Sequence, residues 1–178
     1  RLVAIVKDLD MIAKLETEGL GMNMEVFNII DLTQNVFDLL EMRSKKRNIS
    51  LQFDTVYDFP IFVRGDKERI EQVLINLIVN SIKYGKINGI TSVGIESYNE
   101  NKFIIKVKDN GEGIKKEHIP RLFERFYRVD QSRSREQGGS GLGLSIVKHI
   151  VEAHNEKVLL KSTFKKGSEF SFTMKKVK

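Results

Sequence analysis

The chain has 178 residues, enough for one globular domain with an adequate core, alone or with a small appendage. Hydrophobic residues make up 40% of it without any run of about 18 apolar residues that would span a membrane, and the lack of cysteine excludes disulfides and thiolate metal sites. The net charge of +6 comes from lysines and arginines scattered along the chain, so it does not indicate a nucleic-acid-binding protein.

The first 20 residues carry a helical seam. Apolar residues recur there at the three-and-four spacing of a coiled coil or helix bundle, namely Leu2, Ile5, Leu9 and Ile12. Two glycines at positions 19 and 21 then interrupt the pattern, which predicts a domain boundary near residue 20. An amphipathic stretch from about residue 25 to residue 46 predicts the next helix.

Strands and helices interleave along the rest of the chain. Runs of β-type residues lie at 49–53, 61–64, 91–98, 102–108, 158–162 and 169–174. Helices are predicted at 66–84, with Asp66 as N-cap, and at 141–152. Because there is no strict βαβ repetition, we expect an α/β protein with two layers, in which helices pack on one face of a mixed β-sheet and a short helix precedes them.

The helix predicted over 66–84 carries two stripes. Its core face is apolar and comprises Ile70, Val73, Leu74, Leu77 and Ile78. The adjoining arc holds Asn76, Asn80, Lys83 and Tyr84. A carboxamide oxygen can ligate a hard cation such as Mg²⁺, an ammonium can pair with phosphate, and an aromatic ring can lie against a purine. Two asparagines four residues apart are, however, more often part of a solvated face.

Asp109 ends a predicted strand and begins the turn DNGEG, which leads into Ile114. A carboxylate at a strand end can accept a hydrogen bond from an adenine amino group, while Gly111 and Gly113 let the backbone approach the base closely. Without further context, a turn of this type is simply a common tight turn.

A glycine-dense segment enters the helix predicted at 141–152, with four glycines within residues 138–143. The open N–H groups and partial positive charge of a helix N-terminus attract anions, and glycines leave the approach open. A flexible linker rarely runs straight into an amphipathic helix, so phosphate binding is the favoured interpretation. The residues of this segment expected to bind the nucleotide are Gly139, Ser140, Gly141, Leu142, Gly143 and Leu144. The spacing is neither a Walker A motif nor a dinucleotide fingerprint.

A long polar loop with embedded aromatic residues connects the two glycine segments. It contains the hexapeptide FERFYR, with Phe123, Phe126 and Arg128. These aromatic residues could belong to the core, but long loops of this kind more often act as functional lids.

These segments resemble, in order, spacing and chemistry, the N, G1, F and G2 boxes of the sensor histidine kinase ATP-binding domain. That domain belongs to the GHKL superfamily of ATPases and kinases and has the Bergerat fold. The resemblance implies that ATP and Mg²⁺ bind, that Asn80 ligates the metal, that Asp109 binds adenine, and that Arg128 reaches the terminal phosphate. It also implies an ATP lid over about residues 114–139, anchored by Phe123 and Phe126. Gly167 and Ser168 fit the weak last glycine motif and add little.

The resemblance covers nearly the whole chain. Residues 1–20 resemble the end of the second helix of the dimerization and phosphoacceptor domain, and residues 21–178 the catalytic domain. The family phosphorylates a histidine followed by an acidic residue on the first helix of that domain, and His118, His149 and His154 do not fit this motif. We therefore expect a catalytic fragment of a longer kinase, whose partners are its own phosphoacceptor domain and a response-regulator receiver domain. The resemblance also implies a homodimeric parent, anchored in the bacterial inner membrane with this domain in the cytoplasm, and no nucleic-acid partner.

Two other functions stay open. Gyrase B, the heat-shock protein of 90 kDa and MutL share the superfamily but hydrolyse ATP, and they place a glutamate four residues before the metal-binding asparagine. Asn76 stands at that position and lacks useful basicity, so phosphoryl transfer supported by Asn80 with Mg²⁺, Lys83 and Arg128 is favoured. The second alternative is a non-enzymatic module whose partner contacts depend on nucleotide.

Overall fold

The computed structural model describes residues 6, 9–10, 13, 21–129 and 140–177. Its centre is a 7-stranded sheet in the order β1-β3-β7-β5-β4-β2, with β6 paired to β7. The strands are β1 (Met24–Asn28), β2 (Ser50–Phe53), β3 (Phe62–Asp66), β4 (Ile90–Asn99), β5 (Lys102–Asp109), β6 (Val158–Thr163) and β7 (Gly167–Lys176). Only the β2–β4 pair is parallel, so the sheet is mixed, as predicted.

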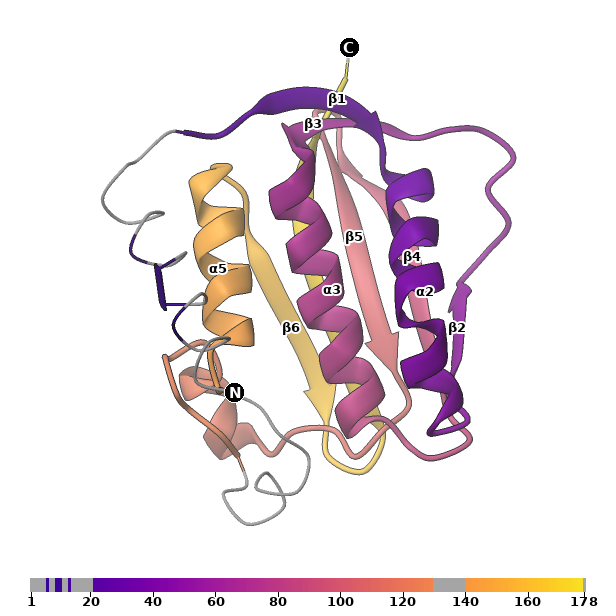
Figure 1. Ribbon diagram of the computed structural model, residues 1–178, viewed down its shortest axis with the longest axis vertical. Helices are drawn as coiled ribbons and strands as arrows, with labels where there is room; N and C mark the ends of the chain where they lie inside the picture. Colours follow the sequence, from indigo (N-terminus) through magenta and orange to yellow (C-terminus); the bar gives the residue numbers. More distant parts are fainter. Residues whose placement is uncertain (1–5, 7–8, 11–12, 14–20, 130–139, 178) are drawn as a thin grey trace.

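The α-helices α2 (Ile29–Lys45), α3 (Lys67–Tyr84) and α5 (Gly143–Ala153) lie side by side on one face of this sheet (Figure 1). The two-layer α/β architecture predicted from the sequence is therefore confirmed. A short 3₁₀ helix, η1 (Lys116–Arg121), lies within the long polar loop predicted between the two glycine segments.

The helix predicted from residue 25 begins later, and that boundary is wrong. Met24–Asn28 forms β1 instead, which pairs antiparallel with β3 so that Val26 lies opposite Arg64. Asn28 keeps an extended backbone and caps α2, because its Oδ1 accepts a hydrogen bond from the Ile30 N–H at 3.1 Å. The same oxygen accepts the Ile61 N–H at 3.1 Å, which ties the cap to the segment before β3.

The boundaries of α3 and α5 have local causes. Asp66 caps α3 as predicted, with its Oδ1 accepting the Arg69 N–H at 3.1 Å. The helix predicted from residue 141 begins at Gly143, because Gly141 has a φ of +75°, a left-handed conformation that cannot belong to a right-handed helix.

The hydrophobic core fills the space between the helices and the sheet. The predicted core face of α3 is buried in full, and its side chains meet Ile29 of α2, Ile146 of α5, and Ile105 and Phe172 of the sheet in one apolar cluster. Each such side chain stabilises the fold by about 1.5–3 kcal/mol relative to an exposed one. The three helices are thereby held in fixed positions over the sheet.

The N-terminal segment is described at four positions only. Val6, Leu9, Asp10 and Ala13 have helical backbone, in agreement with the predicted helix. The remainder of residues 1–20, including the predicted domain boundary, lies outside the described residues. Within the part that is described, no helix is both long and apolar enough to cross a membrane.

Candidate functional site

The two helices that carry the predicted site motifs are neighbours. α3 and α5 pack side by side (Figure 1), and the start of α5 lies close to Asn76 of α3. A Cβ built at Gly143 would lie 3.6 Å from Asn76 Oδ1. The Asn76 Nδ2 atom is buried and has no hydrogen-bond partner in the described structure. A buried polar group left unpaired costs about 1–3 kcal/mol, and a polar ligand bound at this junction would remove that cost.

The start of α5 offers open backbone donors. Leu142 occupies the N-cap position with a fully buried apolar side chain, which cannot cap the helix. Its own N–H donates to Ser140 Oγ at 3.2 Å. The next N–H groups, on Gly143, Leu144 and Ser145, donate to no acceptor among the described residues. Open N–H groups and a helix dipole suit an anion, and phosphate binding by the glycine segment stays a prediction.

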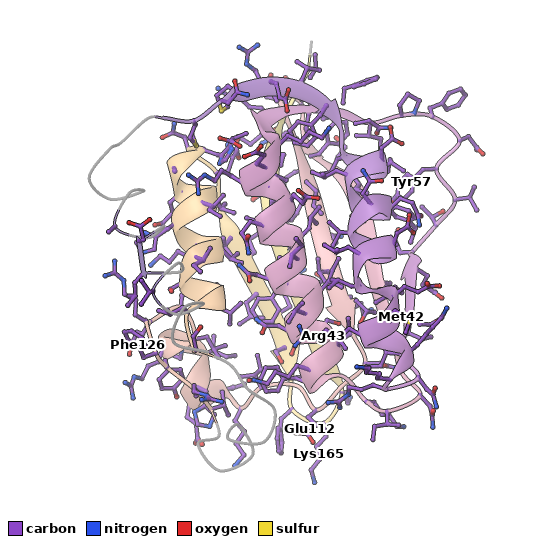
Figure 2. The ribbon with its side chains drawn as sticks, in the orientation of Figure 1. Met42, Arg43, Tyr57, Glu112, Phe126 and Lys165 are labelled. Atoms are coloured by element: carbon purple, nitrogen blue, oxygen red, sulfur yellow. The ribbon has the colours of Figure 1, made fainter. Side chains whose placement is uncertain are left out.

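The first part of the predicted lid is attached to this helix start. The Phe126 N–H donates to the Gly141 carbonyl at 3.0 Å, and a Cβ on Gly141 would lie 2.9 Å from the Phe126 backbone. The Phe126 ring is 54% exposed (Figure 2), so its backbone rather than its ring is the attachment. Phe123 packs edge-on against Phe170 at a centroid distance of 6.4 Å, and its role as an anchor of the lid stays a prediction.

Asp109 ends β5 as a buried carboxylate. Burial raises its pKa, and hydrogen bonds donated by the backbone N–H groups of Gly111 and Ser168 oppose that shift. The Gly111 N–H reaches Asp109 Oδ1 at 2.8 Å. The carboxylate is thus fixed in orientation at the end of the strand, and its role in adenine binding stays a prediction.

The glycines of the Asp109 turn are required by packing. A Cβ at Gly111 would lie 2.4 Å from the Tyr84 carbonyl oxygen at the end of α3. Gly113 has a φ of +65°, and its Cβ would lie 2.1 Å from the Thr163 carbonyl oxygen. The turn is therefore wedged between α3 and the β6–β7 hairpin, where the Lys165 N–H donates to the Glu112 carbonyl at 2.6 Å (Figure 2). The sequence did not reveal this second reason for glycine.

Side chains of the β6–β7 hairpin support the Asp109 turn, and sequence reasoning missed them. Ser162 Oγ accepts the Ile114 N–H at 2.8 Å and lies 2.9 Å from Ser168 Oγ. Gly167 has a φ of +124°, and its Cβ would lie 2.1 Å from the Asp109 carbonyl oxygen. The weak glycine motif at Gly167 and Ser168 was the signal that pointed to this support.

The remaining predicted site residues make fewer contacts that define their position. Asn80 is partly buried one turn beyond Asn76, and its carboxamide makes no hydrogen bond to the described part of the chain. Lys83 places its Nζ 5.0 Å from the centroid of the Tyr84 ring, which is half exposed. Arg128 is partly buried. Gly139 lies outside the described residues.

The donor set fits a magnesium ion better than a metal held by protein alone. Among the residues described, no cluster of three or more histidine and carboxylate side chains is suited to hold a metal. Mg²⁺ retains water and binds through substrate phosphates with one or two protein oxygens, and ligation by the Asn80 carboxamide oxygen stays a prediction.

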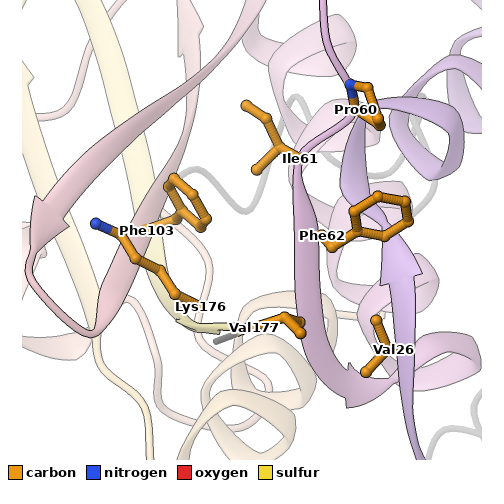
Figure 3. Close-up of a pocket in the computed structure, with 7 residues that line it drawn as sticks. All are labelled: Val26, Pro60, Ile61, Phe62, Phe103, Lys176 and Val177. Atoms are coloured by element: carbon orange, nitrogen blue, oxygen red, sulfur yellow. The ribbon is translucent and has the colours of Figure 1, made fainter.

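A cavity of about 450 Å³ lies at the end of the sheet opposite to the Asp109 turn (Figure 3). Its lining is mostly apolar and comprises Val26, Pro60, Ile61, Phe62, Phe103, Lys176 and Val177. None of the motifs predicted from the sequence reaches it, so it is not part of this site.

Known proteins are similar to this chain in sequence and in fold. The chain is 34% identical over 175 residues to the sensor histidine kinase WalK of Bacillus subtilis (strain 168), an overlap of 98% of this chain and 28% of that protein. The chain thus spans little more than a quarter of that relative's length.

Two solved structures are similar. The catalytic domain of histidine kinase ThkA superposes with a TM-score of 0.75 and 31% identity, over 87% of this chain and 97% of that chain. Full-length ShkA, solved in complex with AMPPNP, has a TM-score of 0.86 over 99% of this chain and 36% of that chain. Its 23% identity supports the shared fold alone.

The match to a family model covers the site itself. Residues 65–178, which include α3, the Asp109 turn and α5, match the family described as histidine kinase-, DNA gyrase B-, and HSP90-like ATPase. The described segments of the N, G1 and G2 motifs lie inside this range and meet in space as set out above. The chain therefore belongs to the family of histidine kinase-, DNA gyrase B-, and HSP90-like ATPases.

Proposed function

We propose that the chain binds Mg²⁺-ATP and transfers the γ-phosphoryl group to a histidine of a separate phosphoacceptor domain. This proposal depends on one observation. The side chain that lies beside the start of α5 is an amide, that of Asn76. An amide has no useful basicity at neutral pH, so it cannot activate a water molecule for hydrolysis. Transfer to an activated acceptor supplied from outside is therefore favoured over ATP hydrolysis.

Phosphoryl transfer asks the protein chiefly for positioning and charge neutralisation. In this proposal the open N–H groups at Gly143 and Leu144 bind phosphate oxygens, and Asp109 accepts the adenine amino group. Lys83 and Arg128 supply positive charge. Bound Mg²⁺ would neutralise the phosphates, with Asn80 as its protein ligand.

The partners follow from the resemblance to sensor histidine kinases. The acceptor histidine belongs to the parent protein's phosphoacceptor domain, to whose C-terminal end we assign residues 1–20, and the next acceptor is an aspartate of a response-regulator receiver domain. The parent is a homodimer anchored in the bacterial inner membrane, with this domain on the cytoplasmic side. The similarity to WalK of Bacillus subtilis, a sensor histidine kinase, supports this assignment.

Two measurements test the proposal in sequence. In calorimetry, ATP should bind more tightly with Mg²⁺ than without it, and Asn80→Ala should remove that difference while leaving the fold intact. In a transfer assay with a cognate phosphoacceptor domain added in trans, Arg128→Ala should slow labelling of the domain more than it weakens ATP binding. ATP binding without any transfer would favour the nucleotide-gated interaction module instead.

A further inference from the structure

Among the strands that the structure describes, β2 has a partner along one edge only. It stands last in the strand order, at the right of the sheet in Figure 1. Its other edge pairs with β4, where the Ser50 N–H donates to Gly89 and the Asp54 N–H donates to Val93, both at 3.0 Å.

Alternate residues of a strand direct their N–H and C=O groups to opposite edges. The groups of Leu51 and Phe53 therefore face away from β4. They form no backbone hydrogen bond there with any described residue. The edge thus presents two donor–acceptor pairs with the spacing of a β-ladder.

The segment after β2 turns away from this edge. The Tyr57 hydroxyl accepts the N–H of Ile95, which belongs to β4, at 2.6 Å. It also lies 3.0 Å from Asp54 Oδ1, to which it can donate. Tyr57 packs edge-on against Phe53 at a centroid distance of 5.6 Å. These contacts hold the segment against β4 and leave the outer edge of β2 uncovered.

A groove of about 360 Å³ runs beside the open edge, between β2 and α2. Its α2 wall is formed by Gln34, Phe37, Asp38, Glu41, Ser44 and Lys45. Phe37 meets Phe53 at a centroid distance of 5.2 Å and forms the apolar floor. An added strand would lie about 4.8 Å from β2, directly over this groove.

The groove carries an unbalanced negative charge. Lys45 pairs with Glu41 at 2.7 Å, which neutralises that carboxylate. Asp38 accepts a hydrogen bond from the neutral Gln34 amide at 2.9 Å and has no cationic partner among the described residues. The chain as a whole has a net charge of +6, so long-range repulsion disfavours a second copy as the occupant. A basic segment of another protein complements the groove.

We propose that the open edge of β2 and the adjoining face of α2 form a docking site for an extended basic peptide. The peptide adds to the sheet as a strand, pairs with the backbone of Leu51 and Phe53, and places a lysine or arginine side chain against Asp38. Strand addition of this kind takes its affinity from main-chain hydrogen bonds and its specificity from alternate side chains. The site lies on α2 and β2, separate from the nucleotide site on α3, β5 and α5.

The probe is a capped heptapeptide of alternating lysine and threonine, titrated into the ¹⁵N-labelled chain and followed by two-dimensional NMR. We expect shift changes confined to residues 34–45 and 49–54, together with slowed amide exchange at Leu51 and Phe53. Asp38→Lys should weaken binding by about fivefold or more and transfer the preference to a glutamate–threonine peptide. Glu100→Lys, an equal charge change in the exposed β4–β5 turn, is the matched control and should change neither.

Backbone pairing is tested by the peptide itself. In an extended peptide the lysine N–H groups face one edge and the threonine N–H groups face the other, and only one edge pairs with β2. N-methylation of the residues that face β2 should therefore abolish binding, whereas N-methylation of the residues that face away should not. Four results would overturn the proposal. They are no shift changes at millimolar peptide, shifts located elsewhere, equal effects of the two methylated sets, and shifts that depend on protein concentration without peptide, which would indicate pairing between two copies.

Discussion

Replacing Gly143 by alanine should separate the stability of the fold from access to the start of α5. In the structure, the new methyl group would lie 3.6 Å from Asn76 Oδ1 and 3.8 Å from its Cγ, which is ordinary van der Waals contact. Alanine is more favourable than glycine in a helix interior by roughly 0.5–1 kcal/mol, and because Gly143 is the first residue of α5 the gain should be at most about 0.5 kcal/mol. For a chain of this size, the melting temperature should therefore rise by at most about 2 °C.

The same methyl group would stand among the open N–H groups that we propose bind phosphate. Loss of that approach should lower the affinity for Mg²⁺-ATP at least tenfold, or about 1.4 kcal/mol. Scanning and titration calorimetry on one sample measure both effects. Gly21→Ala is the control, because its Cβ would meet nothing within 4 Å. A Gly143→Ala chain with unchanged ATP affinity would refute the placement of phosphate at this helix start.

Further predictions concern the other supports of the site and the sheet. Because burial raises the pKa of Asp109 in the folded chain, the stabilisation from its carboxyl is full below the unfolded pKa of about 3.9 and is lost as the pH rises through the folded pKa. Urea titrations should therefore show Asp109→Asn gaining stability relative to wild type between about pH 4 and pH 7, and the opposite trend would contradict a buried carboxylate. Gly141→Ala should destabilise the chain by about 1–3 kcal/mol because its φ is +75°, whereas Gly21→Ala should not; equal urea midpoints would contradict this. Lys102→Met should cost about 2–3 kcal/mol because it leaves the Glu156 carboxylate, 2% exposed, without its cation, and an added Glu156→Gln should recover most of the loss.

Local patterns in the sequence predicted the parts of the fold that local forces determine. The apolar face of α3 and its N-cap at Asp66 both depend on residues of that one helix, and the structure confirms both. The start of α2 was misplaced because Asn28 has a dual role. Its oxygen caps the helix and also binds the Ile61 N–H, a residue 33 positions away that no helical pattern contains.

The support around the Asp109 turn could not be predicted for the same reason. Ser162 contributes through a hydrogen bond to the Ile114 N–H, across 48 residues. That contact depends on the pairing of β6 with β7, which sets Ser162 opposite Ser168. The unpaired amide of Asn76 is likewise visible only once α5 packs beside α3. The spacing of the motifs therefore predicted which residues could bind nucleotide. The residues that support the Asp109 turn could be found only from the tertiary structure.

The fate of the γ-phosphate tests the central claim most directly. One reaction would contain the chain, Mg²⁺, γ-labelled ATP and a cognate phosphoacceptor domain, with label counted on protein and as inorganic phosphate. The account predicts acid-labile label on the histidine of the added domain, and only background label on the chain itself and in free phosphate. Rapid release of inorganic phosphate without the acceptor, or acid-labile label accumulating on the isolated chain, would contradict it.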